Sequence, residues 1–261
     1  MSHVHFPSYS VLERDGHDYL IGHGKTLPDM PDPDTAALLF DLLGLVQEPL
    51  PPFYRDYEDE RPMQTAIPAE RILALSEKYG MPDLPRPVPD DILQKQIRES
   101  GGGAGAVVHL PAFRYRAAWL YHHYNTWYEL ERSIRGPYTQ RSLIRILNLG
   151  RTDFASEDEE LRLVLASEVS AVVAEIRLKA VYDHDKRTFA VRQLTSSLIS
   201  LAYLALARMM AGETAKSAEY LRRCANPLCA RLFIASHGHQ KYCINCDRRA
   251  VHRLRKAKGQ E

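Results

Sequence analysis

Two short strings near the end of the chain, Cys224-Ala-Asn-Pro-Leu-Cys229 and Cys243-Ile-Asn-Cys246, hold all four cysteines of the 261-residue sequence. Two close pairs of thiols joined by a short loop can present four sulfur ligands tetrahedrally to one Zn²⁺ ion. So small a segment buries too little apolar surface to fold alone, whereas structural Zn²⁺ contributes on the order of 10 kcal/mol to small domains. We therefore predict a structural zinc site formed by Cys224, Cys229, Cys243 and Cys246.

The same cysteines allow other interpretations. They could form disulfides or lie unligated in a core, although clustered thiols in a reducing compartment favour a metal. A redox role for the second pair would need a thioredoxin-like βαβ context, which the neighbouring sequence lacks. Three nearby histidines are alternative metal ligands: His237, His239 and His252.

The residues around the cysteines predict a small zinc-finger fold. Pro227 favours a tight turn inside the first pair, and two β-prone runs, 231–234 and 240–243, predict a hairpin. A helix is expected from about residue 244, with the second cysteine pair at its start. The order knuckle, hairpin, cysteine pair, helix is that of a treble-clef zinc finger.

The charge of the chain is unevenly distributed. The whole sequence has a net charge of +1, but residues 214–261 contain eleven Lys/Arg and three Asp/Glu, hence +8, which leaves −7 for residues 1–213. Such a basic tail favours a polyanionic partner over a merely solvated helix end. The predicted nucleic-acid contacts follow the last cysteine directly: Arg248, Arg249, Arg253, Arg255 and Lys256.

The string Arg222-Arg-Cys-Ala-Asn-Pro-Leu-Cys-Ala-Arg-Leu-Phe233, followed by Lys241-Tyr-Cys243, resembles the CGNR-type zinc finger of bacterial transcription regulators. In that family a larger helical N-terminal domain precedes a C-terminal treble clef associated with DNA binding. The resemblance implies the same four-cysteine metal site and DNA as the partner. The family's Cys-Gly-Asn-Arg signature is Cys246-Asp-Arg-Arg249 here, and the second cysteine spacing is shorter than is usual in the family.

The rest of the chain predicts a mainly helical body with a short β-hairpin near the N-terminus. The hairpin is expected around Asp15-Gly16, because this dipeptide suits a tight turn between two apolar runs. Helices are expected after Asp34, after Pro68 as far as Gly80, and after Ser156, whose capping box satisfies backbone N–H groups.

From Ala106 to Met210 the apolar pattern predicts helices throughout. Its last part is expected to be an antiparallel helix pair joined by residues 182–187. An aromatic-rich helix, 113–134, carries His122 and His123, whose side chains point about 100° apart on a helix, so they are expected to be core or surface residues and not joint metal ligands.

We therefore expect a mainly α protein with a helical domain over 1–213 and a zinc-finger domain over 214–261. The first domain would comprise a Pro-rich, acidic part, 1–105, and a helical core, 106–213. No apolar run is long enough to span a bilayer and no secretory signal is visible, so a cytoplasmic location without a membrane partner is expected.

These features predict a zinc-binding regulator that binds nucleic acid, DNA rather than RNA, with a helical body for ligand sensing or self-association as a homo-oligomer. The alternative is a zinc-stabilised protein–protein interaction module. A treble-clef nuclease of the His-Asn-His kind would need an open metal position and further catalytic residues, which the sequence does not supply, so no enzyme activity is expected.

Overall fold

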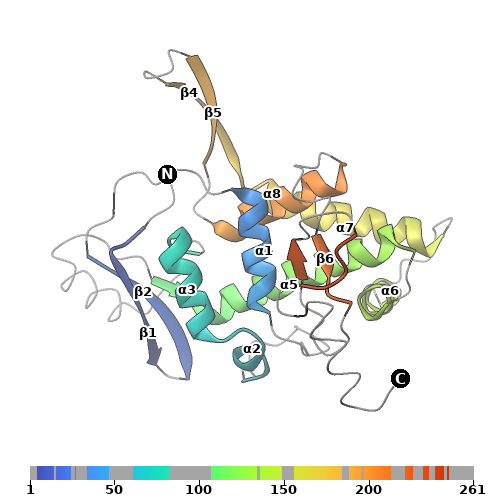
Figure 1. Ribbon diagram of the computed structural model, residues 1–261, viewed down its shortest axis with the longest axis horizontal. Helices are drawn as coiled ribbons and strands as arrows, with labels where there is room; N and C mark the ends of the chain where they lie inside the picture. Colours follow the sequence, from blue (N-terminus) through green and yellow to red (C-terminus); the bar gives the residue numbers. More distant parts are fainter. Residues whose placement is uncertain are drawn as a thin grey trace. The chain divides into compact units, whose positions relative to one another are not determined.

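The structure is a computed structural model of the chain (Figure 1). It describes residues 5–14, 16–24, 27, 34–46, 61–82, 107–133, 136–148, 156–183, 188–194, 197–212, 221–225, 232–234, 239–243 and 246. The chain divides into two compact units, Met1–Ala207 and Arg208–Glu261. The boundary predicted at residue 213 falls outside the described residues and stays a prediction.

As predicted, the described part of unit 1 is mainly helical and carries a small antiparallel sheet near the N-terminus. Its helices in chain order are α1 (Thr35–Leu45), α2 (Arg61–Ala66), α3 (Ala69–Tyr79), α5 (Leu110–Glu131), α6 (Pro137–Asn148), α7 (Glu157–Val173) and α8 (Leu198–Met210), the last of which ends in unit 2. None of these helices combines the length and the apolar character needed to cross a bilayer.

The sheet begins with the predicted N-terminal hairpin. Strands β1 (Ser8–Arg14) and β2 (His17–His23) pair antiparallel, and Gly16 at the turn has a φ of 80°, which glycine adopts without steric cost. A third strand, β3 (Val107–His109), pairs with β2 from far along the chain. The hairpin is therefore held in a three-stranded sheet of order β1-β2-β3.

The predicted helix starts are confirmed, because local capping chemistry determines them. The Asp34 carboxylate accepts hydrogen bonds from the first-turn N–H groups of α1, and the Ser156 hydroxyl accepts one from Glu159 N–H at 3.2 Å at the start of α7. Helix α3 starts directly after Pro68 and ends at Gly80, whose φ of 90° suits a C-terminal cap.

Helix α5 is the centre of unit 1. It contacts α1, α2, α6, α7 and the sheet, and most of its residues are buried. The fully buried Phe113 belongs to this core, as do the three aliphatic side chains Leu110, Leu120 and Leu130. The aromatic-rich segment thus forms the core helix that the sequence predicts.

A buried ion pair joins α5 to the sheet. The Arg114 guanidinium, only 1% exposed, donates from Nη2 to Asp18 Oδ2 at 2.6 Å and from Nε to the Ile67 carbonyl at 3.0 Å. Asp18 lies on β2 and Ile67 follows α2, so one side chain connects three segments that are distant in sequence.

The prediction of an antiparallel helix pair joined by residues 182–187 is wrong for residues 177–194, although α7 and α8 on either side are helices as expected. This segment forms an antiparallel hairpin of β4 (Arg177–Asp183) and β5 (Thr188–Leu194), placed between α7 and α8. The apolar positions Ile176 and Ala180 continued the helical stripe of α7 by spacing alone. The same segment also alternates polar and apolar residues and is rich in β-branched and aromatic types, which favour strands.

Candidate metal centre

The described part of unit 2 is arranged around a short strand pair. Strands β6 (Leu221–Arg223) and β7 (Leu232–Ile234) are antiparallel, with Arg222 opposite Phe233. The sequence predicted a hairpin between residues 231–234 and 240–243. The first of these runs does form a strand, β7, but the prediction of its partner is wrong, because β7 pairs with β6. Because β6 ends directly before Cys224, the strand pair encloses the loop that holds the first cysteine pair.

Backbone hydrogen bonds bring the second cysteine pair beside Cys224. The Ala225 N–H donates to the Lys241 carbonyl at 2.8 Å, which joins the residue after Cys224 to the segment before Cys243. The Cys246 N–H donates to the Cys243 carbonyl at 2.9 Å and closes a tight turn. These two contacts place Cys224, Cys243 and Cys246 next to one another.

The sulfur atoms of these three cysteines lie within 4.8 Å of one another. Cys224 and Cys243 are buried and Cys246 is partly buried, and all three are thiols rather than half-cystines. In a tetrahedral site with Zn–S bonds of about 2.3 Å, neighbouring sulfurs are about 3.8 Å apart. The cluster is thus close to the size of a metal site, and three thiolates at this spacing could hold a metal ion.

The donor set fits a soft divalent metal. Thiolate ligands favour zinc or similarly thiophilic ions over calcium and magnesium, which bind oxygen. His239, one of the alternative ligands, is exposed and is not a member of the cluster. The described residues therefore supply three ligands, all of them cysteines.

Several predicted site residues lie outside the described part of the chain. They are Cys229, His237, His252, Arg248, Arg249, Arg253, Arg255 and Lys256. The fourth thiolate, the helix after Cys246 and the nucleic-acid contacts consequently stay predictions.

Unit 1 contains buried polar contacts that the sequence did not predict as a group. His123 of α5 lies between two partners, with its Nδ1 2.9 Å from the Tyr203 hydroxyl of α8 and its Nε2 3.0 Å from Glu168 Oε2 of α7. Burial raises the pKa of the Tyr203 hydroxyl, so this group stays protonated. Each ring nitrogen of His123 thus faces one partner, the Tyr203 hydroxyl from α8 or the Glu168 carboxylate from α7.

The neighbouring His122 is also buried, as expected for a core histidine. Its Nε2 lies 2.9 Å from the Ser142 hydroxyl of α6, while the Trp119 ring packs against the rings of both histidines. The two imidazoles thus bond to different helices, which confirms that they do not share a site.

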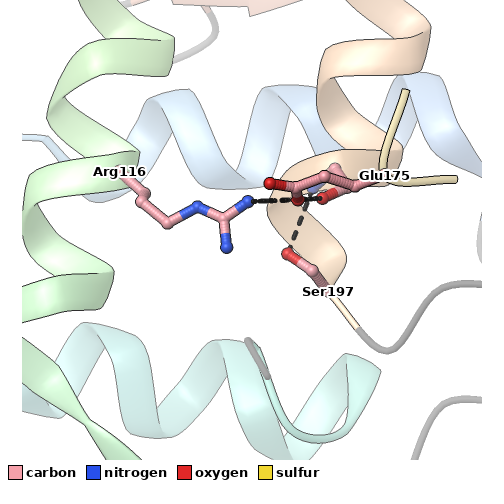
Figure 2. Close-up of polar contacts among 4 residues, drawn as sticks. Arg116, Glu175 and Ser197 are labelled. Carbon is pink, nitrogen blue, oxygen red and sulfur yellow. Dashed lines mark hydrogen bonds and ion pairs between the residues drawn. The ribbon is translucent and has the colours of Figure 1, made fainter. Parts of the chain in front are cut away.

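A second polar group includes Arg116, which lies two turns before His123 on α5 (Figure 2). The Arg116 guanidinium donates to Glu175 Oε2 at 3.0 Å and to the Ser200 hydroxyl at 3.3 Å, and that hydroxyl donates to Glu175 Oε2 at 2.9 Å. Ser197 caps α8 by accepting from the Ser200 N–H at 3.3 Å. These donors and acceptors bond to one another, so their role is to fix α5, the end of α7 and the start of α8 in register.

Sequence reasoning missed this group because its members are far apart in the chain. A spacing of seven residues places Arg116 and His123 on one stripe of α5, and the same spacing separates Glu168 of α7 from Glu175, which follows the end of that helix. That regularity was visible in the sequence, but the pairing between helices was not.

No protein-family model, curated protein or solved structure matches the chain.

Proposed function

We propose that unit 2 is a zinc finger that presents the basic C-terminal segment to DNA, and that the protein is a cytoplasmic transcription regulator. The single observation that supports this most is the cluster of Cys224, Cys243 and Cys246, whose sulfur atoms lie within 4.8 Å of one another. Cysteines that are 19 and 22 residues from Cys224 converge on one point, as ligands of a common ion do.

Cys229 is the fourth ligand in this proposal. It lies five residues after Cys224 in the loop between β6 and β7, and a fourth thiolate closes a tetrahedral zinc shell. With the shell closed, the ion has no open position for substrate or water, so its role is to stabilise the unit.

The basic segment makes the finger a nucleic-acid-binding element. Residues 247–261 contain six Lys/Arg and two Asp/Glu, and they follow the last cysteine directly. Such a density of cations neutralises phosphates, and arginine also reaches guanine edges in the major groove. Unit 1, with its own apolar core, would carry ligand sensing or self-association.

Metal analysis of the full-length protein tests the zinc site. We expect one equivalent of zinc per chain in the wild type and none in Cys243→Ala. His239→Ala is the matched control, because this nearby histidine is exposed and outside the sulfur cluster. Zinc loss in the histidine variant, or full retention in the cysteine variant, would contradict the proposed ligand set.

DNA binding is tested by measuring the affinity of the zinc-loaded full-length protein for duplex DNA over a series of salt concentrations. With five or six phosphates neutralised, log K should fall with log salt at a slope of roughly −5. Arg248→Ala/Arg249→Ala/Arg253→Ala should bind more weakly with unchanged zinc content. Absence of salt-dependent binding to any duplex would reject the proposal and favour a protein–protein interaction module.

A further inference from the structure

The β4–β5 hairpin differs from the rest of unit 1 in how it is supported. Seven residues of each strand pair from Arg177↔Leu194 to Asp183↔Thr188, and the two strands form a sheet of their own in the described part of the chain. Figure 1 shows this ribbon standing away from the helices of unit 1. A lone two-stranded ribbon is marginally stable in water, so a partner that binds it would add to its stability.

The register gives the ribbon two different faces. Residues directly opposite in an antiparallel pair share a face, and the faces alternate along each strand. Lys179 is opposite Arg192, and Arg177 lies two residues before Lys179, so these three cations share the face that we call the basic face. The same face also holds Leu194 opposite Arg177 and the pairs Val181↔Ala190 and Asp183↔Thr188.

The opposite face is largely apolar. It holds the pairs Leu178↔Gln193, Ala180↔Val191 and Tyr182↔Phe189. Backbone pairing over the full length of both strands keeps the ribbon in a single register. The basic face is thereby presented on a regular support instead of a flexible loop.

The charge of this segment contrasts with its surroundings in sequence. Residues 177–194 contain five Lys/Arg and two Asp/Glu, whereas the remainder of residues 1–213 contains 18 Lys/Arg and 28 Asp/Glu. A local excess of +3 inside a region that otherwise carries −10 favours a polyanionic partner at this place.

We propose that the β4–β5 ribbon is a second DNA contact, with the basic face of Arg177, Lys179 and Arg192 lying along the phosphates of a duplex. This inference rests on the proposed function, because it assumes that the protein binds DNA. Two strands of seven residues form a ribbon about 20 Å long. The major groove of B-DNA, about 12 Å wide, admits a two-stranded β-ribbon.

The same geometry favours DNA over RNA. The major groove of an A-form RNA duplex is deep and narrow, so a ribbon that enters the groove of B-DNA finds no equivalent site there. Substitutions in the basic face should therefore weaken binding to duplex DNA more than binding to duplex RNA of the same sequence.

The test uses the zinc-loaded full-length protein and a short duplex, with affinity measured by fluorescence anisotropy over a range of salt. The variant Arg177→Gln/Lys179→Gln/Arg192→Gln removes the three cations and keeps polar residues in the strands. We expect the slope of log K against log salt to become shallower by about 2 to 3, and affinity at moderate salt to fall at least about tenfold.

Two matched variants separate local contact from net charge and from folding. The variant Arg14→Gln/Arg132→Gln/Arg162→Gln removes three exposed cations from other elements of unit 1 and should bind almost as the wild type does. The variant Arg177→Lys/Lys179→Arg/Arg192→Lys keeps the charges of the ribbon and should keep the salt slope. Far-UV circular dichroism and zinc content should match the wild type in all three.

Three outcomes would overturn the inference. In the first, the ribbon variant binds no more weakly than the charge-matched control although Arg248→Ala/Arg249→Ala/Arg253→Ala lowers affinity; the finger then binds DNA alone. In the second, the ribbon variant changes the sedimentation mass and leaves DNA affinity unchanged, so the ribbon's partner is a second copy of the chain. In the third, the wild type binds no duplex, which rejects the proposed function as well.

Discussion

Different interactions stabilise the interior of unit 1 and the interior of unit 2. Unit 1 has a core of buried aliphatic and aromatic side chains around α5, with polar groups such as Arg114 and His123 each paired inside it. The described part of unit 2 has two three-residue strands and two buried cysteines. Apolar burial accounts for the first unit, whereas in the proposed account a bound ion offsets the entropy of ordering the second.

Among the changes considered, removal of the metal is expected to lower stability the most, and it should do so in unit 2 only. A strong chelator should unfold unit 2, because structural zinc contributes on the order of 10 kcal/mol to domains of this kind. The helices of unit 1 should keep most of the far-UV circular dichroism signal. Limited proteolysis of the chelated protein should then cleave the basic tail first. If the chelator unfolded both units to the same extent, the proposed difference in how the two units are stabilised would be contradicted.

Truncation of a side chain in the unit 1 core should destabilise unit 1 and leave unit 2 unchanged. Phe113 is fully buried on α5, so Phe113→Ala should lower the free energy of unfolding of unit 1 by about 3 to 5 kcal/mol. Zinc content should not change. Leu163→Ala is the control, because this side chain is 53% exposed and its loss should change stability by less than about 0.5 kcal/mol. Urea denaturation of both variants provides the measurement.

Loss of a polar contact in unit 1 should also lower the free energy of unfolding more when the contact is buried than when it is exposed. Asp18→Asn leaves the Arg114 guanidinium, 1% exposed, without its carboxylate and should cost about 3 kcal/mol. The exposed pair of Lys78 and Asp41 also lies at 2.6 Å, and its hydrogen bond raises the pKa of Lys78. Solvent screens this pair, so Asp41→Asn should cost less than about 1 kcal/mol. Similar losses in the two urea titrations would contradict the role given to burial.

Local chemistry explains which parts of the fold could be predicted. The N-terminal hairpin with Gly16 at its turn, the Asp34 and Ser156 caps and the Gly80 stop each depend on a few adjacent residues, and each is found as predicted. The hairpin at 177–194 was missed because a short segment satisfies the helical and the strand periods together. Its alternation of polar and apolar residues was the signal that could have identified it.

Contacts between distant segments could not be predicted in the same way. Strand β3 pairs with β2 across more than eighty residues of chain. Strand β7 pairs with β6 and not, as predicted, with residues 240–243. Nothing in the local sequence determines such partners. The metal site is the exception, since cysteine spacing alone predicted the convergence of Cys224, Cys243 and Cys246.

X-ray absorption at the zinc edge of the full-length protein tests the central claim most directly, because it identifies the ligands around the ion. The proposed site of Cys224, Cys229, Cys243 and Cys246 predicts a shell of four sulfur atoms at about 2.3 Å. A shell that contains nitrogen or oxygen ligands, or a purified protein that retains no zinc, would contradict the account.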